Sequence, residues 1–465
     1  MREILLFAAG RAIEFLEHLD ERATGATADR AALLEALDRP LPDRSEPIET
    51  VLREMARGVE PGLVASAGPR YFGFVIGGAT PASLAAADWL TSAWDQNAQV
   101  YDSAPAAAVV EEIVGRWIVD LLCLPSGSSV GFVTGGQMAN FTALSAARNA
   151  VLSRHGWNVD EEGLNGAPDL RVLLSEQAHA TVTSALRMMG LGRRQTCPLP
   201  ADDQGRMCLD ALEAELAARS GPTIVSVQAG NVNSGAFEPI GAIVDRARPS
   251  GAWIHVDGAF GLWAAASPAH RHLVDRVGEA DSWAVDAHKW LNVPYDSGIV
   301  VVRHPLHHQS LKTARCAYAG VESDDRRDGS AFVPENSRRA RGFVLYAALR
   351  TLGRSGVADL VAGCCACARE FARRLAHLPD ATVLNEVVLN QVLARFDPPG
   401  VGDREAFHHR LAAAVQREGT CWCGPTRWRD ATALRFSFSN WQPTEGDVRR
   451  SVDSIEAVYR ALVES

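Results

Sequence analysis

The sequence contains very little lysine. Of its 46 lysine and arginine residues, only Lys289 and Lys312 are lysines. A guanidinium stays charged and is a poor nucleophile, whereas an amine can lose its proton when desolvated and attack a carbonyl. A chain that otherwise uses arginine is expected to keep lysine where amine chemistry is required. Both lysines are therefore candidates, and their neighbours must decide between them.

The chain also lacks an uninterrupted apolar run of about 18 residues, the length that would span a bilayer. It has no strongly basic segment, and its net charge of -10 argues against nucleic acid or an anionic membrane as the main partner. Residues 1–25 have the pattern of an amphipathic helix, without the features of a signal peptide. We therefore expect a cytoplasmic protein that binds neither nucleic acid nor membrane.

A metal site is not expected either. Nine cysteines in a long chain without a secretion signal favour reduced thiols. Cys364, Cys365 and Cys367 lie in a segment with helical periodicity, where buried apolar thiols are the simpler explanation. The histidine pairs lack the spacing of a zinc-binding HExxH helix.

Short β-branched runs alternate with helical segments from about residue 130 onward, as in "VGFVTGG", "AWIHVDGAF" and "SWAVDAHKW". This pattern predicts an α/β fold with a mostly parallel sheet covered on both faces. Residues 1–70 are predicted to be a helical segment, 71–335 a large α/β domain, and 336–465 a smaller α+β domain. Ligands of such sheets bind beyond the carboxyl ends of the strands, so the polar residues after each run should line one cleft.

Five short motifs follow the predicted strands. "VTGGQMAN" opens a helical segment, and backbone N–H groups at such a start bind phosphate, although a structural Gly–Gly turn is the simpler explanation for it alone. His179 follows one strand, and a lone histidine is more often structural. Asp257 ends another strand, where a buried carboxylate needs a partner. Asn231 lies in a loop, and Lys289 lies in "DAHKW"; Lys312 has no comparable neighbours and is predicted to be a surface or loop residue.

Together the motifs point to pyridoxal 5'-phosphate (PLP). This cofactor needs a lysine for an aldimine, a carboxylate that keeps its pyridine nitrogen protonated, a phosphate cradle at a helix start, and groups against both ring faces. Lys289 and Asp257 can supply the amine and the carboxylate. Residues 135–137 can form the cradle, and His179 and Ala259 can pack against the ring. One strand–helix–strand unit separates Asp257 from Lys289, so both can reach the same cleft.

The motifs "HVDGAFG", "DSWAVDAHKWLNVPYDSG", "GGQMAN" and "SEQAH" resemble the PLP-dependent family of glutamate, histidine, tyrosine and aromatic-amino-acid decarboxylases. "SRRARGFVLYAALRTLGRSG" and "LRFSFSNW" match it too, so the resemblance covers roughly residues 65–460. It implies the aspartate-aminotransferase fold (fold type I) and an obligate homodimer with its active site at the subunit interface. It also implies decarboxylation of an L-amino acid to the amine and CO₂.

The resemblance gives each residue of the cofactor site a role. Lys289 forms the aldimine, Asp257 pairs with the pyridinium nitrogen, and His179 stacks on one ring face. Ala259 lies against the other face, and Asn231 lies beside the cofactor. The phosphate is held by Gly135, Gly136, Gln137 and His288.

The substrate is less well specified. The segments "YFGFVIGG" and "WDQNAQVYDSAP" resemble the substrate-pocket segments of the family. Arg435 could bind a substrate carboxylate with its guanidinium fork, and a structural ion pair is the alternative. The candidate substrate residues are Tyr71, Phe74, Asn97, Tyr318 and Arg435.

Three departures from the family pattern leave the reaction open. Aromatic-amino-acid members carry a loop tyrosine that protonates the quinonoid carbon, and the corresponding region here, near Gly329, has none. Tyr318 or His179 would have to supply that proton. "QM" replaces the common "SE", and "AGN" replaces "AGT". The alternatives are transamination, aldehyde-forming oxidative decarboxylation or carbon–carbon lyase chemistry on the same scaffold, or a catalytically silent binding or regulatory protein.

Overall fold

The computed structural model describes residues 1–311 and 326–464, so Lys312 and Tyr318 lie outside the described residues. The chain forms two compact units. One consists of Met1–Ile76, Arg369–Leu384 and Val392–Ser465, and the other of Gly77–Ala368 and Asn385–Gln391. The predicted division into a helical segment (1–70), a large domain (71–335) and a smaller domain (336–465) stays a prediction.

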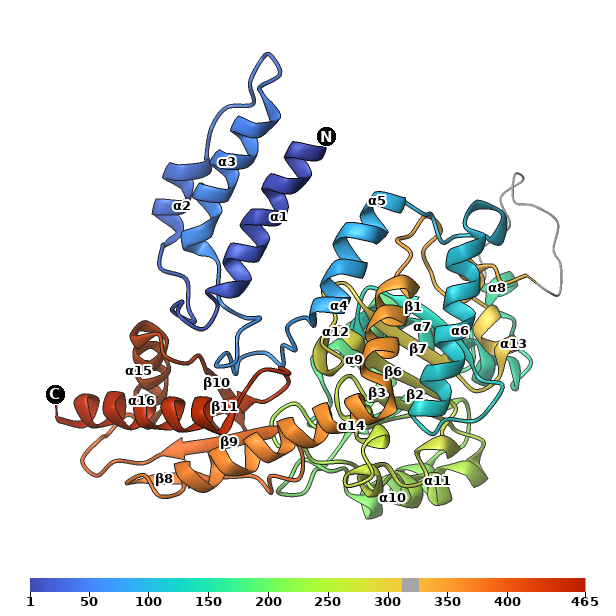
Figure 1. Ribbon diagram of the computed structural model, residues 1–465. Helices are drawn as coiled ribbons and strands as arrows, with labels where there is room; N and C mark the ends of the chain where they lie inside the picture. Colours follow the sequence, from blue (N-terminus) through green and yellow to red (C-terminus); the bar gives the residue numbers. More distant parts are fainter. Residues whose placement is uncertain (312–325, 465) are drawn as a thin grey trace. The chain divides into compact units, whose positions relative to one another are not determined.

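The second unit is built on a seven-stranded sheet with the strand order β1-β7-β6-β5-β4-β2-β3 (Figure 1). Strand β7 is antiparallel to both of its neighbours, β1 and β6, and the other neighbouring strands run parallel. The mostly parallel α/β sheet predicted from the sequence is therefore confirmed. The strands are β1 (Ser129–Val133), β2 (Arg171–Ser175), β3 (Thr196–Leu199), β4 (Thr223–Gln228), β5 (Trp253–Asp257), β6 (Ser282–Asp286) and β7 (Gly298–Val302).

Helices connect and cover these strands. Helix α7 packs on β5, β6 and β7 and also against α9. Its buried face is rich in alanine, and small side chains let the helix lie close to the sheet. The helices of this unit are α4 (Pro81–Leu84), α5 (Ser92–Trp94), α6 (Pro105–Leu121), α7 (Gly136–Ser153), α8 (Val159–Glu162), α9 (Ala180–Met188), α10 (Leu209–Ala218), α11 (Ile240–Ala247), α12 (Ala287–Trp290), α13 (Pro305–Gln309) and most of α14 (Gly342–Leu375).

The alternation of side chains along β5 and β6 places a polar row beneath α7. Trp253 and Ala284 belong to the hydrophobic core that α7 covers. Successive side chains of a strand point to opposite faces, so every second residue shares the face of Trp253 or Ala284. That face also carries the polar side chains of His255, Asp257, Ser282 and Asp286.

The first unit combines helices with a four-stranded sheet of order β10-β11-β9-β8. Four buried phenylalanines whose rings contact one another contribute to its core: Phe72, Phe371, Phe436 and Phe438. Its elements are α1 (Arg2–Glu17), α2 (Arg30–Leu37), α3 (Ile48–Val59), β8 (Ala381–Val383), β9 (Gln391–Phe396), α15 (Arg404–Glu418), β10 (Gly424–Trp428), β11 (Ala431–Ser437) and α16 (Glu445–Glu464). Over the described ranges, no helix has both the length and the apolar content to cross a membrane.

Candidate active site

Lys289 lies on α12, a single helical turn that directly follows β6. Its Nζ is 3.0 Å from Oδ2 of Asp286, the last residue of that strand. The Lys289 side chain is 20% exposed, whereas that of Asp286 is 3% exposed. The second oxygen, Asp286 Oδ1, is buried and has no hydrogen-bond partner among the described residues. The amine is thus held at the carboxyl edge of the sheet by a carboxylate with unused acceptor capacity.

Glycines allow the start of α7 to approach this edge closely. A Cβ atom on Gly136 would lie 2.7 Å from Asp286 Oδ2, and one on Gly135 would lie 3.1 Å from His288 Cε1. A Cβ on Gly298 would lie 2.5 Å from the Cα of Gly135. The first N–H groups of a helix have no partner within the helix, and they attract anions. An anion site at the start of α7 would therefore lie beside the turn that carries Lys289.

His288 is neutral in this setting. Burial lowers the pKa of the imidazole, which outweighs the opposing effect of Asp286. The backbone N–H of Ser297 donates to Nδ1 at 3.3 Å, so Nδ1 is the acceptor and the proton lies on Nε2. Nε2 is 3.5 Å from Asp286 Oδ1. The ring therefore offers one N–H donor on the side of the start of α7.

Asp257 ends β5, the strand next to β6, and is 5% exposed. Its Oδ2 accepts from Asn140 Nδ2 at 3.3 Å, and its Oδ1 accepts from the backbone N–H of Ala259 at 3.3 Å. The carbonyl of Ala259 in turn accepts from the N–H of Asp286 at 2.8 Å. The ends of β5 and β6 are thus fixed to each other, and both of their carboxylates lie at the same edge of the sheet.

His179 caps α9 with its side chain. Its Nδ1 accepts from the backbone N–H of Thr181 at 3.3 Å and lies 2.8 Å from Thr181 Oγ1. Because Nδ1 is an acceptor, the proton of the neutral ring is on Nε2. Asn140 Nδ2 lies 3.4 Å from the same Thr181 oxygen. One amide group therefore connects the loop of His179 with Asp257.

Two other predicted cofactor residues use their side chains within the protein. Asn231 Oδ1 accepts two backbone N–H groups of its own loop, at 2.9 and 3.2 Å. Its Nδ2 donates to the carbonyl of Gln177 at 3.4 Å, which ties this loop to the segment before His179. Gln137 is exposed, and its Nε2 lies 3.7 Å from Met188 Sδ. The backbone N–H of Gln137 lies at the start of α7, where helix N–H groups attract anions.

Of the candidate substrate residues, only Asn97 lies in the described part of the Lys289 unit. Its Oδ1 accepts from the backbone N–H of Arg338 at 3.1 Å, and its Nδ2 lies 3.4 Å from Ser337 Oγ. Tyr71, Phe74 and Arg435 belong to the other unit. There Tyr71 stacks on Trp422 with ring centroids 4.8 Å apart, and Phe74 is exposed. The substrate roles of these residues stay predictions.

Three residues near the site were missed in the sequence. They are Asp286, Asn140 and His255. Each had a local signal: Asp286 opens the "DAHKW" motif, Asn140 closes "GGQMAN", and His255 lies two positions before Asp257 on the same strand face. In the described ranges, no group of three or more His, Cys, Asp or Glu residues could hold a metal ion.

These residues fit pyridoxal phosphate. In the described part of the chain, the buried Asp286 Oδ1 has no hydrogen-bond partner, and it lies 3.5 Å from His288 Nε2 on the Lys289 turn. At the two glycines that begin α7, any side chain larger than hydrogen would contact His288 or Asp286, so glycine keeps the backbone N–H groups of this helix start accessible. Asp257 receives two N–H donors, the environment that a carboxylate requires. An amine, an anion-binding helix start and a buried carboxylate are the groups that this cofactor needs.

Comparisons with known proteins agree with this fit. The family model described as "Pyridoxal-dependent decarboxylase conserved domain" matches residues 31–396. An aromatic-L-amino-acid decarboxylase of Bacillus atrophaeus is 24% identical over 470 residues, which cover 98% of this chain and 95% of that protein. L-2,4-diaminobutyrate decarboxylase of Rhizobium meliloti (strain 1021) is 28% identical and covers 92% of this chain and 86% of its own length.

The fold is equally well matched. The crystal structure of Oryza sativa TDC with PLP and tryptamine has a TM-score of 0.92 at 23% sequence identity, covering 99% of this chain and 98% of that chain. The protein is therefore a PLP enzyme of fold type I. It belongs to the pyridoxal-dependent decarboxylase family. It is a PLP-dependent amino acid decarboxylase, a carboxy-lyase, and the predicted family and cofactor are confirmed.

Proposed function

We propose that the chain decarboxylates an L-amino acid at the site around Lys289 and that the Lys289 amine bonds to the carbonyl carbon of PLP. The observation that carries this proposal is the position of Nζ, 3.0 Å from Asp286 at the end of β6. The glycine-rich start of α7 and the Asp257 carboxylate lie at the same edge. When bound, PLP supplies an electron sink for the bond that breaks at the substrate Cα.

The remaining residues hold the cofactor. The backbone N–H groups of residues 135–137 and the Nε2–H of His288 bind the phosphate. Asp257 holds a proton at the pyridine nitrogen. His179 and Ala259 would pack against the cofactor ring, and Asn231 shapes its own loop.

The chain must also orient the substrate and return a proton. A decarboxylase has to hold the α-carboxylate out of the plane of the cofactor ring, because orientation selects the bond that breaks. We propose Tyr71, Phe74, Asn97, Tyr318 and Arg435 for this task. His179 carries a proton on Nε2, and it is the proposed donor to the substrate Cα because no tyrosine lies near Gly329.

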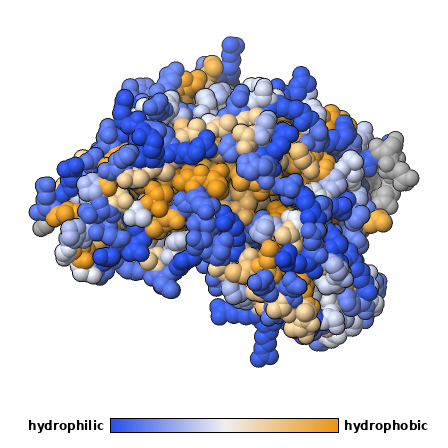
Figure 2. Space-filling model, turned by 90° about the horizontal axis from the view of Figure 1, so that it is seen from below, coloured by the Kyte–Doolittle hydropathy of each residue, from blue (hydrophilic) through white to orange (hydrophobic). Residues whose placement is uncertain are grey.

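A homodimer with the active site at the subunit interface is part of the proposal. Neither α1 nor α2 has a buried residue, and large apolar side chains of α1 are exposed, among them Leu5 at 52% and Leu6 at 61%. Exposed apolar patches of this kind mark interaction surfaces. Figure 2 shows hydrophobic residues reaching the surface among hydrophilic ones on one face. Light scattering on the purified protein would test the dimer, and a cytoplasmic location stays a prediction.

The proposed function is tested by CO₂ release from a panel of L-amino acids that begins with aromatic amino acids and L-2,4-diaminobutyrate, the substrates in the names of two relatives. Amine, aldehyde, keto acid and hydrogen peroxide are measured in the same reactions. CO₂ with an equal amount of amine supports simple decarboxylation and identifies the substrate. Aldehyde with peroxide, or keto acid without CO₂, would contradict it in favour of the oxidative or aminotransferase alternative.

A further inference from the structure

A continuous row of buried polar groups lies beneath α7 and ends at Asp257. Trp253 Nε1 donates to Ser282 Oγ at 2.9 Å, and Ser282 Oγ lies 2.9 Å from Nδ1 of His255. His255 Nε2 lies 2.9 Å from Asn140 Oδ1, and Asn140 Nδ2 donates to Asp257 Oδ2 at 3.3 Å. All five side chains are at most 5% exposed. A row with so little access to water has to satisfy its hydrogen bonds internally.

The chemistry of the groups fixes the direction of each hydrogen bond. An indole N–H only donates, so Ser282 accepts from Trp253. Both oxygens of Asp257 accept, so the NH₂ group of Asn140 faces Asp257 and its oxygen faces His255 Nε2. Burial lowers the pKa of His255 to about 3, so the imidazole is neutral near pH 7. Because the amide oxygen of Asn140 can only accept, the single proton of the ring lies on Nε2, and Nδ1 accepts from Ser282 Oγ. The amide oxygen of Asn140 therefore accepts from His255, and the amide NH₂ group donates to Asp257.

From this row we propose that His255 and Asn140 are positioning residues, which orient one amide so that an N–H donor always faces Asp257 and holds that carboxylate aimed at the cofactor. The inference rests on the proposed role of Asp257 toward the pyridine nitrogen. Residues that orient a functional group in this way commonly affect it without touching the ligand.

The alternative orientation of the amide shows why His255 is needed. If the Asn140 amide were flipped, its oxygen would face Asp257 and its NH₂ group would face the Nε2–H of His255. Both contacts would be repulsive in a dry environment, where unpaired polar groups are costly. The flip would also remove the contact of Asn140 Nδ2 with Thr181, the residue bonded to His179. His255 therefore fixes a donor that serves both Asp257 and the helix cap at His179.

A second buried histidine provides a matched control. His308 on α13 is also fully buried, its pKa is lowered to about 3 by burial, and its Nδ1 lies 2.8 Å from Ser129 Oγ. It is not part of the row that ends at Asp257. Replacing either histidine by leucine removes a buried imidazole and its bond to a serine. Among the described residues His308 Nε2 has no hydrogen-bond partner, so His308→Leu should cost less stability than His255→Leu, which leaves Asn140 Oδ1 unpaired.

The test compares His255→Leu, His255→Gln and His308→Leu in the full-length protein. Two quantities are measured: the dissociation constant of PLP from titration of the apo-protein, and the ¹⁵N chemical shift of the pyridine nitrogen of bound, ¹⁵N-labelled PLP. In His255→Leu we expect PLP to bind about 10-fold more weakly, the effect of one lost buried hydrogen bond. The ring nitrogen signal should move toward that of unprotonated pyridine. His255→Gln supplies an amide N–H to Asn140, so its PLP affinity and its ¹⁵N chemical shift should both lie close to the wild-type values. His308→Leu should change neither quantity.

If His255→Leu does not fold, Asn140→Asp is the second variant, because it keeps an acceptor for His255 but replaces the N–H donor to Asp257 by an oxygen. We expect the same weaker binding and the same movement of the ¹⁵N signal. Wild-type values in the variant measured, or equal changes in His308→Leu, would overturn the inference. Asp257→Asn separates the two claims, because an unchanged ¹⁵N signal in that variant would mean that the proposed role of Asp257 is itself wrong.

Discussion

The two ends of strand β6 carry buried aspartates in opposite settings. At the amino end, Asp281 directly precedes the strand, and its Oδ1 and Oδ2 accept from Arg248 Nη1 at 2.9 and 3.0 Å. Its Oδ2 also accepts from the backbone N–H of Ile254 at 2.8 Å. At the carboxyl end, Asp286 contacts Lys289 and leaves Oδ1 without a hydrogen-bond partner in the described part of the chain. Both oxygens of Asp281 accept hydrogen bonds from the protein. Asp286 Oδ1 accepts none from the described residues, so it can still accept one from a ligand.

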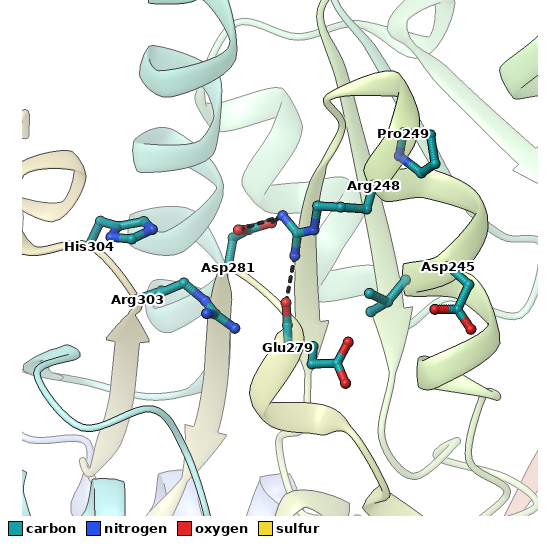
Figure 3. Close-up of a pocket in the computed structure, with 8 residues that line it drawn as sticks. Asp245, Arg248, Pro249, Glu279, Asp281, Arg303 and His304 are labelled. Carbon is teal, nitrogen blue, oxygen red and sulfur yellow. Dashed lines mark hydrogen bonds and ion pairs between the residues drawn. The ribbon is translucent and has the colours of Figure 1, made fainter.

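The surroundings of the amino end strengthen this contrast. Figure 3 shows Arg248 between Asp281 and Glu279 in a pocket rich in charged groups, with Arg303 nearby. Arg303 donates to the backbone carbonyl of Ala280, so this cation is also engaged by the fold. Opposite charges that saturate one another stabilise a structure and leave no reactive group. A concave surface rich in charge is therefore not evidence of an active site on its own, and the difference lies in which polar atoms remain unpaired.

The largest expected effect concerns the amine at the carboxyl end. Lys289→Ala should lower turnover by about 10³-fold or more, since the group that bonds to the cofactor is lost. Lys289→Arg keeps a positive charge beside Asp286 and should lose as much, because a guanidinium is a poor nucleophile. Turnover and cofactor trapped by borohydride, detected by mass spectrometry, check both variants. Retained turnover in the arginine variant would show that charge, and not amine chemistry, is what matters here.

Asp257→Asn should lower turnover by about 10²-fold, because the ring nitrogen loses the charged group that keeps it protonated. The fold should persist, since the amide has nearly the same size. Steady-state rates and circular dichroism measure the two quantities. Asp257→Ala is the more severe variant, and near-normal rates in either would refute the assigned role.

Asp286→Asn tests the carboxylate with the unpaired oxygen. It should lower kcat/KM by about 10-fold, because Lys289 loses the charge that holds its amine in place. The melting temperature should change little, because Lys289 is partly solvated and, among the described residues, Asp286 Oδ1 has no hydrogen-bond partner to lose. A large loss of stability with normal activity would assign Asp286 to the fold, like Asp281.

Asp281→Asn is the counterpart at the amino end, with the expected effects reversed. It should destabilise the fold by about 1–3 kcal/mol, since Arg248 and the N–H of Ile254 lose a charged acceptor. The kcat/KM of the folded fraction should stay at the wild-type value. Urea unfolding and rates on the same samples measure both, and a specific loss of activity would break the contrast between the two ends.

The last expected effect leaves activity at neutral pH unchanged and appears only as a change of stability in acid. Burial lowers the pKa of His308 from 6.5 to about 3, so below pH 6.5 the unfolded chain takes up a proton at this residue that the folded chain does not. The resulting stabilisation is fully present above pH 6.5 and is lost as the pH falls toward 3. His308→Leu should reduce the slope of unfolding free energy against pH in this window by up to one proton, about 1.4 kcal/mol per pH unit. Urea unfolding at pH 4–7 measures the slope, and an unchanged slope would mean that His308 is not the residue titrating.

Much of the site could be predicted from local patterns in the sequence. Strand–helix alternation predicted the mostly parallel sheet, and the polar residues after each strand predicted the functional edge, because parallel strands end on one side. The scarcity of lysine left two candidates, since an amine has chemistry that arginine lacks, and the neighbours in "DAHKW" then favoured Lys289. These inferences needed only periodicity and residue chemistry over a few neighbouring positions.

Contacts between distant parts of the chain could not be predicted in this way. Asn140 and Asp257 are 117 positions apart, and only the packing of α7 on β5 makes the amide a donor to the carboxylate. Asp281, which precedes β6, and Asp286, which ends it, are the same residue type and cannot be told apart by residue chemistry alone. Arg248 reaches one of them, and glycines let a helix start approach the other. The residues present set which chemistry is possible, but three-dimensional packing decides which polar atoms are paired, because hydrogen bonds depend on distances that chain order does not fix.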